Sequence, residues 1–262
     1  MRLRSLLYVP ADNERFIAKA HERGADAIIL DLEDSVRPEH RDAARKNLGS
    51  SIRSAGQAGA KVFVRINTES ATEDATAAAG SDGLYVPKAS RARIEALATD
   101  GPNLPLFALV EDPMALLDVA AIAAHSAVSG LAAGGEDLAT ALGAVPDPDV
   151  LRTPKLLIHY AAKAHGKLSL GLFRSIADYA DLSAIEHAAK EARRHGFDGA
   201  SCVHPSAVPI LNAVFAPTSE ELDWAHRVLA TAETNKAGAF RVDGRMIDAP
   251  IIARARSILS QT

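Results

Sequence analysis

The sequence contains one cysteine, Cys202, so no disulfide can form within the chain. This cysteine usage is typical of proteins in a reducing compartment, and we expect a cytoplasmic location. Long apolar runs are also missing. The first residues, MRLRSLLYVPADNERF, hold only a short apolar run before Pro10, and no later run approaches the length of a membrane-spanning helix. We therefore predict neither a signal peptide nor a membrane span.

Clusters of positive charge are absent as well. The chain has 29 Lys and Arg against 33 Asp and Glu, a net charge of −4, and no basic run or stripe. This balance argues against nucleic acid or an anionic membrane as a partner. The first strand-like run is followed by YVPADNER, without the glycine-rich fingerprint of a dinucleotide-binding fold.

Short apolar runs alternate with segments of helical spacing through the first 215 of 262 residues. The runs are continuous rather than alternating, which is typical of parallel strands buried on both faces. Eight such units without a long linker predict a closed (β/α)8 TIM barrel over residues 1–215, with an open doubly wound sheet as the alternative. The predicted strands are Ser5–Val9, Ala27–Asp31, Lys61–Asn67, Gly83–Lys88, Pro105–Glu111, Ser129–Gly134, Leu168–Phe173 and Phe197–His204. Residues 216–262 predict a C-terminal helical extension, with helices at Ser219–Thr234 and Ile251–Ser260.

Polar residues gather where the predicted strands end, and in such a barrel the active site lies at that end. Glu111 and Asp137 follow adjacent strands and form a candidate Mg²⁺ site, because Mg²⁺ often takes one or two carboxylates and completes its shell with water and substrate oxygens. For each acid the alternative is a helix cap or a partner for a structural arginine, and Asp137 in particular suits a helix N-cap. The strand-end candidates are Asp31, Glu33, Asp34, Arg65, Asn67, Lys88, Glu111, Asp112, Glu136, Asp137, Ser201 and His204.

Arg65 lies in an apolar strand, where a charge needs a partner. One interpretation is a structural ion pair with Glu33 or Asp34, and another is a clamp on a substrate carboxylate or enolate oxygen. Both interpretations are compatible, with the acids orienting the arginine. A Schiff base at Lys88 is disfavoured because neighbouring carboxylates keep the amine charged. His204 is better explained as a hydrogen-bonded residue at the barrel mouth than as a ligand.

Several stretches, taken together and in order, resemble one family. They are RSLLYVPADNERFIAKA, GADAIILDLEDSV, VRIN, VPKA, ALVEDPMALLDVAAIA, GGEDLATALG, GFDGASCVHPSAVPILNAVF, DWAHRVLA and DGRMIDAP, from Arg4 to about Pro250. The chain resembles the beta subunit of citrate lyase and its stand-alone relatives in the HpcH/HpaI aldolase and citrate lyase superfamily. The resemblance implies a barrel, Mg²⁺ and reversible carbon–carbon cleavage of a 3-hydroxy-acid thioester of the citryl-, citramalyl- or malyl-CoA type.

The resemblance also implies roles for individual residues. Glu111 and Asp137 match the metal ligands, Arg65 matches the arginine that holds the oxo-acid portion, and Glu33 with Asp34 match acids just behind the metal ligands. Asp248 matches an aspartate on a C-terminal segment that reaches into a neighbouring subunit's site, which implies a homotrimer or hexamer. Asp248 is then the expected acid or base, and the Glu33 and Asp34 pair is the alternative base.

The sequence departs from the family pattern at positions near the expected thioester arm. Gly171 stands where many thioester lyases of the family carry aspartate, and Asn13 stands where some malyl-CoA enzymes carry arginine. The fifth-strand motif reads V-E-D, which adds Asp112 beside Glu111. Alternative functions are therefore a metal-dependent aldolase acting on free 4-hydroxy-2-oxo acids, or a subunit of a larger complex that acts on a thioester of an acyl carrier protein.

Overall fold

The computed structural model describes residues 2–175, 179–235 and 239–261. The chain folds as two compact units, Leu3–Phe215 and Ala216–Thr262, and each is described by itself. Among the helices of the described residues, none combines the length and the hydrophobicity needed to cross a membrane.

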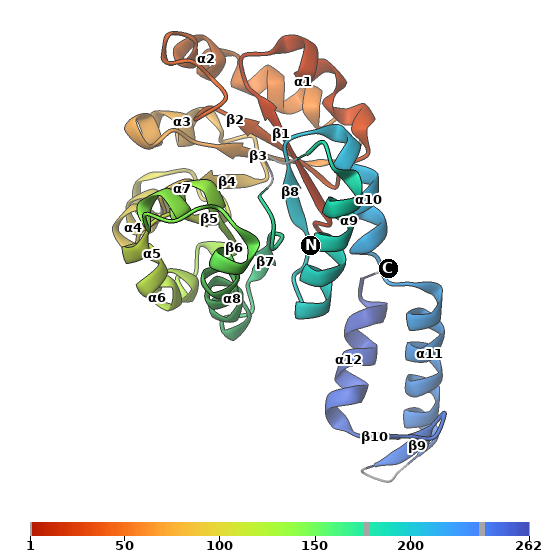
Figure 1. The fold of residues 1–262 in the computed structure, drawn as a ribbon. Helices are drawn as coiled ribbons and strands as arrows, with labels where there is room; N and C mark the ends of the chain where they lie inside the picture. Colours follow the sequence, from red (N-terminus) through yellow and green to blue (C-terminus); the bar gives the residue numbers. More distant parts are fainter. Residues whose placement is uncertain (1, 176–178, 236–238, 262) are drawn as a thin grey trace. The chain divides into compact units, whose positions relative to one another are not determined.

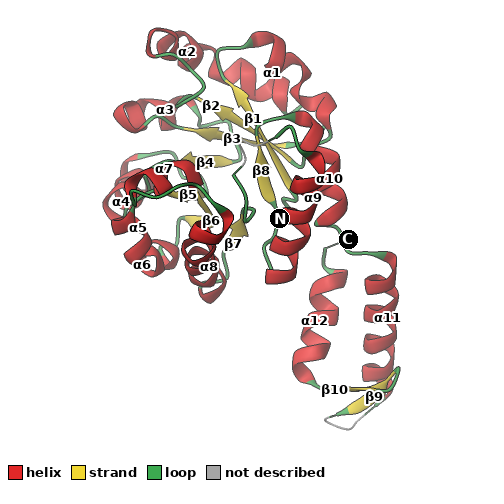
Figure 2. Cartoon of the chain, in the orientation of Figure 1, coloured by secondary structure: helices red, strands yellow, loops and turns green. Residues whose placement is uncertain are grey.

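The first unit is built on one eight-stranded parallel sheet with the order β7-β6-β5-β4-β3-β2-β1-β8 (Figure 1). Consecutive strands are neighbours, and β1 pairs with both β2 and β8, so the sheet curls into a barrel with helices outside it (Figure 2). This confirms the predicted TIM-barrel fold. The strands are β1 (Ser5–Pro10), β2 (Ala27–Asp31), β3 (Lys61–Arg65), β4 (Gly83–Val86), β5 (Leu106–Val110), β6 (Val128–Ala133), β7 (Leu168–Leu170) and β8 (Ala200–Cys202).

Helices follow the strands and lie on the outer face of the barrel (Figure 1). Several begin at a residue whose side chain accepts a hydrogen bond from the first turn, such as Ser90, Asp112 and Asp181, which satisfies an otherwise unpaired amide. The α-helices of this unit are α1 (Glu14–Ala20), α2 (Pro38–Ala55), α3 (Ala71–Ala77), α4 (Arg91–Asp100), α5 (Pro113–Leu117), α6 (Val119–Ala124), α7 (Gly135–Ala141), α8 (Pro148–Ala164), α9 (Leu182–His195) and α10 (Val208–Val214). Short 3-10 turns lie at His21–Arg23, Thr68–Ser70 and Pro205–Ala207.

Two hydrophobic layers hold the barrel together. The outer layer packs strand residues such as Ile28 and Val64 against the helices, and the inner layer fills the barrel with large side chains. In the inner layer the rings of Tyr85 and Phe107 stack at 5.3 Å, with Phe63 tilted against Phe107 at 4.7 Å. With the interior filled in this way, the large cavity of the barrel lies at its mouth.

The barrel closes between β7 and β8 through a few backbone contacts around Gly199. Leu170 and Gly199 form a bridge, and the amide of Gly171 donates to the carbonyl of Gly199 at 2.9 Å. Both strands are shorter than predicted. The predicted strand Leu168–Phe173 ends early because the chain turns at Gly171, where φ is +151°.

The second unit is a helical hairpin with its own core. Helices α11 (Ser219–Thr234) and α12 (Ala249–Leu259) lie side by side and are joined by the small antiparallel hairpin β9 (Phe240–Val242) and β10 (Arg245–Ile247) (Figure 1). A capping box at Thr218 and a buried cluster that includes Val228 and Phe240 stabilise it. The predicted helix at Ile251–Ser260 begins two residues earlier, because Asp248 caps it and Pro250 is tolerated in its first turn.

Gly199 is the position where we expect closure of the barrel to be most sensitive. A β-carbon there would lie 1.8 Å from the backbone oxygen of Leu3, which cannot move without disturbing β1. Gly199→Ala should lower the free energy of unfolding by about 3 kcal/mol, at the upper end of typical overpacking costs. Urea denaturation followed by circular dichroism measures this. Gly80→Ala, where a β-carbon meets nothing within 4 Å, is the control, and equal stability of the two variants would contradict the prediction.

Candidate active site

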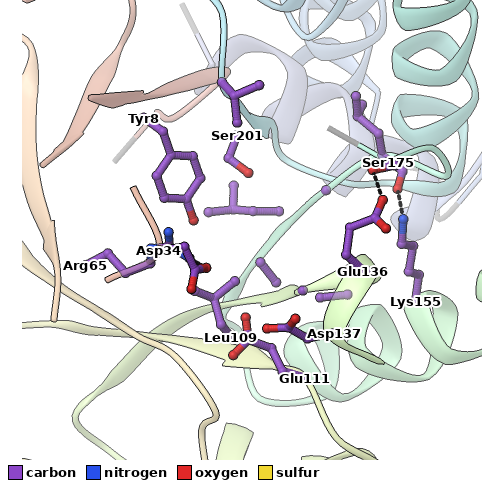
Figure 3. A pocket seen from close by; sticks show the side chains of 18 of the residues that line it. Tyr8, Asp34, Arg65, Leu109, Glu111, Glu136, Asp137, Lys155, Ser175 and Ser201 are labelled. Atoms are coloured by element: carbon purple, nitrogen blue, oxygen red, sulfur yellow. Dashed lines mark hydrogen bonds and ion pairs between the residues drawn. The ribbon is translucent and has the colours of Figure 1, made fainter. Parts of the chain in front are cut away.

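A cavity of about 450 Å³ opens at the carboxyl ends of the strands. Residues of β1, β2, β3, β5, β6, β7 and β8 line it, together with the loops that follow them. The strand-end candidates that reach this cavity are Asp31, Asp34, Arg65, Glu111, Glu136, Asp137 and Ser201. The parallel sheet brings them together because all its strands end at the same edge (Figure 3).

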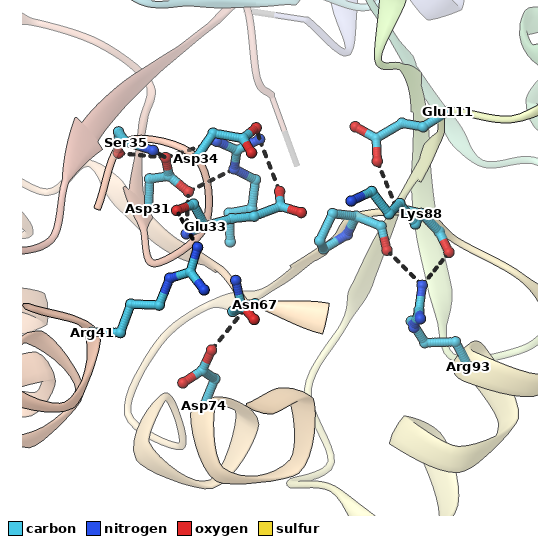
Figure 4. A network of polar contacts seen from close by, with 12 residues as sticks. Asp31, Glu33, Asp34, Ser35, Arg41, Asn67, Asp74, Lys88, Arg93 and Glu111 are labelled. Atoms are coloured by element: carbon cyan, nitrogen blue, oxygen red, sulfur yellow. Dashed lines mark hydrogen bonds and ion pairs between the residues drawn. The ribbon is translucent and has the colours of Figure 1, made fainter. Parts of the chain in front are cut away.

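Arg65, at the end of β3, is held by three acids from the β2 end. Its Nε and one terminal nitrogen donate to the two carboxylate oxygens of Asp31 at 2.6 and 2.7 Å. Its other terminal nitrogen lies 2.9 Å from Asp34 and 3.1 Å from Glu33 (Figure 4). The sequence predicted Glu33 or Asp34 as the partner, and the structure adds Asp31 as the bidentate one. Register explains this, because Asp31 and Arg65 are directly paired on adjacent strands.

Burial shapes the protonation of this cluster. Burial alone would raise the pKa of Asp31, but the hydrogen bonds and charge of Arg65 outweigh it, and the pKa falls below its usual value. Glu33 behaves differently. Burial raises its pKa to about 8, opposed by Arg65 and assisted by the charges of Asp34, Glu111 and Asp31. One arginine does not neutralise so many buried carboxylates, which favours the protonated form of Glu33.

Glu111, at the end of β5, has its carboxylate held closely between the Lys88 amide and Gly134. Its Oε2 accepts the backbone amide of Lys88 at 2.6 Å, and its side chain lies so close to Gly134 that a β-carbon there would be 2.4 Å from Oε1. Lys88 takes the left-handed conformation, with φ +46°, to present this amide. Arg93 donates to the carbonyls of Pro87 and Lys88 and so supports the turn (Figure 4). The Lys88 side chain is exposed and does not line the cavity, so it is not positioned for an imine.

Glu111 and Asp137 are the residues that fit a metal ion. Their carboxylates lie next to each other at the cavity (Figure 3). Burial, with the charge of Asp137 adding to it, raises the pKa of Glu111 to about 7 although the Lys88 amide opposes the shift. Asp137 is not a helix cap, because α7 begins after Gly134. Two carboxylates suit Mg²⁺, which completes its octahedral shell with water and substrate oxygens. Residues 2–175, 179–235 and 239–261 contain no group of three or more His, Cys, Asp or Glu suited to a metal.

The far wall of the cavity, opposite Arg65, combines apolar residues with one buried lysine, Glu136 and Ser175 (Figure 3). Lys155 of α8 donates to the carbonyls of Leu172 and Arg174 at 2.9 and 3.2 Å, and burial lowers its pKa to about 8. The hydroxyl of Ser175 donates to the Glu136 carboxylate, so the loop after β7 is tied to both α8 and α7 (Figure 3). Sequence reasoning missed Lys155, although its place between Leu151 and Ile158 on the buried face of a helix was a usable signal.

Other predicted residues lie elsewhere. Asp112 caps α5, with its side chain accepting the amide of Ala115 at 2.8 Å, and His204 is exposed and caps the turn at Pro205–Ala207. Asp248 belongs to the second unit, where its carboxylate accepts the amide of Ile251 at 3.4 Å. Gly171 lines the cavity, while residues 176–178 of the same divergent segment lie outside the described residues.

Comparisons with known proteins all relate the chain to one protein family. The family model described as HpcH/HpaI aldolase/citrate lyase matches residues 4–205. A (3S)-malyl-CoA thioesterase of Cereibacter sphaeroides is 37% identical over 98% of this chain and 94% of its own length. A citrate lyase subunit beta-like protein of Mycobacterium tuberculosis is 34% identical over 97% and 93%. The crystal structure of protein CitE from M. tuberculosis with magnesium, acetoacetate and coenzyme A has a TM-score of 0.80 and 32% identity, covering 99% of this chain and 98% of that one.

The proton held by Glu33 makes stability depend on pH. Its pKa is about 8 in the folded protein against about 4.3 in an unfolded chain, so its contribution is present below pH 4.3 and is lost as the pH rises to 8. In chelator-treated protein, wild type should therefore lose stability relative to Glu33→Gln across this window, by at most about 5 kcal/mol and by less to the extent that solvent screens the carboxylate. Urea unfolding at several pH values measures the difference. Exposed Glu73→Gln should run parallel to wild type, and parallel curves for Glu33→Gln as well would contradict the shift.

Proposed function

The chain belongs to the HpcH/HpaI aldolase/citrate lyase family, and from this premise we propose that it is a Mg²⁺-dependent carbon–carbon lyase. Its proposed substrate is a 3-hydroxy-acid thioester of the citryl-, citramalyl- or malyl-CoA type, which it cleaves to an acyl thioester and an oxo acid. The observation that carries the proposal is the pairing of the Glu111 and Asp137 carboxylates in the same cavity as an oriented, buried guanidinium, that of Arg65.

Ligands of the relatives support this reading. One M. tuberculosis structure contains magnesium, acetoacetate and coenzyme A, and another, 32% identical with a TM-score of 0.71, contains oxaloacetate and magnesium. We transfer these ligand classes to the present cavity. Glu111 and Asp137 would hold Mg²⁺, and Arg65 would hold the oxo-acid carboxylate. Apolar residues of the lining, including Leu172, would face the thioester arm.

The chemistry follows from where charge moves. Mg²⁺ held by Glu111 and Asp137 would supply Lewis-acid chemistry at the substrate hydroxyl and at the carbonyl derived from it. A carboxylate base takes the hydroxyl proton, the carbon–carbon bond breaks, and its electron pair passes to the acyl half as an enolate. A proton returned to the enolate carbon completes the acyl thioester. Arg65 is held rigidly by Asp31, so it can counter the carboxylate charge throughout without reorganising.

We propose Asp248 as the acid or base that reprotonates the enolate carbon, acting from one subunit in the site of another. Asp34, which lines the cavity beside Arg65, is the alternative base, with Glu33 behind it. A shared site requires a homo-oligomer, and a homotrimer or hexamer remains the prediction. A cytoplasmic location likewise stays a prediction.

Thioester hydrolysis is a second candidate, because the 37% identical relative is named a (3S)-malyl-CoA thioesterase. The same cavity would then bind the same substrate class, but water would break the carbon–sulfur bond. The products separate the two reactions, since hydrolysis releases free coenzyme A and a hydroxy acid. Cleavage of free 4-hydroxy-2-oxo acids, and action within a carrier-protein complex, remain further alternatives.

The direct test is cleavage of citryl-CoA, (S)-citramalyl-CoA and malyl-CoA with and without Mg²⁺. We expect release of acetyl-CoA and an oxo acid that stops with a chelator. Glu111→Gln should lose Mg²⁺ affinity and activity, and Arg65→Ala should lower kcat/KM about 10³-fold, because a preorganised charge is removed from the site. Mass spectrometry identifies the products. Surface variant Glu73→Gln is the control, and release of free coenzyme A alone would favour hydrolysis and overturn the lyase proposal.

A substitution at Asp248 can distinguish its proposed role in catalysis from its role as the N-cap of α12. Asparagine caps helices as well as aspartate does, so Asp248→Asn should leave the free energy of unfolding within about 0.5 kcal/mol while lowering kcat at least about 10²-fold. Asp147→Asn, at the equivalent cap of α8, should change neither quantity appreciably.

Subunit mixing then tests the shared site. Inactive Asp248→Asn and inactive Arg65→Ala proteins, dissociated and reassembled together, should regain part of the activity, because some sites combine intact groups from two chains. Absence of any regain after confirmed reassembly would contradict a site shared between subunits.

A further inference from the structure

Two hydroxyl groups face the cavity without a role in the chemistry described so far. Tyr8 lies near the end of β1 and Ser201 lies in β8, the strand that pairs with β1. Ser201 is opposite Leu6 in the register, and Leu6 and Tyr8 share the inward face because side chains alternate along a strand. Both side chains therefore line the cavity, and both hydroxyls point into it (Figure 3).

Within the described part of the chain, neither hydroxyl has a hydrogen-bond partner. Most of the polar groups around them are committed. Arg65 is bound by three acids, Lys155 is bound by two backbone carbonyls, and Ser35 donates to Asp31 at 2.5 Å. Two uncommitted donors on adjacent strands, on the same side of one cavity, are suited to a ligand oxygen.

Both apolar residues and charged groups surround these two neutral hydroxyls. Tyr8 packs against the inner layer of the barrel core, with its ring edge-on to Tyr85 at 6.3 Å, and Leu109, Ala132 and Leu170 are the nearby apolar lining. The guanidinium of Arg65 lies 5.1 Å from the Tyr8 ring centre, which fixes the ring. Burial raises the pKa of Tyr8 further above its usual value against the effect of Arg65, so the phenol remains a proton donor.

We propose that the hydroxyls of Tyr8 and Ser201 form a donor pair that binds the carbonyl oxygen of the substrate thioester. This inference rests on the proposed function. It names the residues that would bind the thioester carbonyl, the substrate group that neither Arg65 nor the metal would bind. Carboxylate and hydroxyl oxygens suit Arg65 and the metal, whereas a thioester carbonyl is neutral in the bound substrate and becomes negative as the enolate forms. Two neutral donors stabilise the oxygen more strongly in the second state than in the first, which is what catalysis requires.

The test uses acetyl-CoA labelled with ¹³C at its carbonyl, bound to Mg²⁺-loaded protein without an oxo acid. Hydrogen bonds to the carbonyl oxygen move this ¹³C signal downfield, so wild type should show a downfield shift on binding. Tyr8→Phe and Ser201→Ala should each lose part of the shift, and the double variant should lose nearly all of it. In the cleavage assay each single variant should lower kcat/KM about 10²-fold, as expected for loss of one donor to a developing oxyanion.

Two controls make the result specific. Tyr85→Phe removes a hydroxyl that is buried in the barrel interior without a partner, and it should leave the ¹³C shift unchanged. Tyr8→Phe keeps the ring over Arg65, so the affinity for pyruvate with Mg²⁺ should stay at the wild-type value. A full shift retained in the double variant, or an equal loss of pyruvate affinity, would overturn the donor pair. Wild type that binds no acetyl-CoA at all would overturn the proposed function itself.

Discussion

The bidentate ion pair between Asp31 and Arg65 is the interaction on which the rest of the site depends. Both groups are largely buried, and each would be costly to leave unpaired in an apolar barrel. The pair fixes the guanidinium, and the guanidinium in turn holds Glu33, Asp34 and the ring of Tyr8. Its position follows from the parallel register of β2 and β3, so the fold sets the electrostatics of the cavity directly.

The cavity divides according to charge. Arg65 and its acids occupy one side, the Glu111 and Asp137 carboxylates lie between, and a wall that combines apolar residues with Lys155, Glu136 and Ser175 faces them (Figure 3). A 3-hydroxy-acid thioester has the matching sequence of groups, from a carboxylate through a hydroxyl to a neutral thioester. This match, rather than any single residue, relates the barrel mouth to the proposed lyase reaction.

Much of this arrangement was predictable from the sequence, and the exceptions have physical causes. Apolar runs and their spacing predicted the barrel, because parallel strands buried on both faces leave that pattern. The strand-end positions of Arg65 and Glu111 predicted that they meet in one cavity. The bidentate role of Asp31 depends on strand register, and the contacts of Lys155 depend on how α8 packs, and neither is encoded in local spacing. Tyr8 was missed because an aromatic residue in a strand is ordinarily a packing residue. The roles assigned to the site residues stay predictions.

The turn at Lys88 has a consequence for which sequences can occupy the site. Glu111 is held there by a backbone amide, a group that every residue except proline supplies. The residues that position 88 tolerates are therefore limited by backbone conformation and not by side-chain chemistry. A φ of +46° favours glycine or asparagine over bulky residues. At Lys88 this conformation is stabilised by Arg93, which donates hydrogen bonds to the carbonyls of Pro87 and Lys88. Side-chain changes at position 88 that keep this backbone conformation therefore leave the hydrogen bond to Glu111 in place.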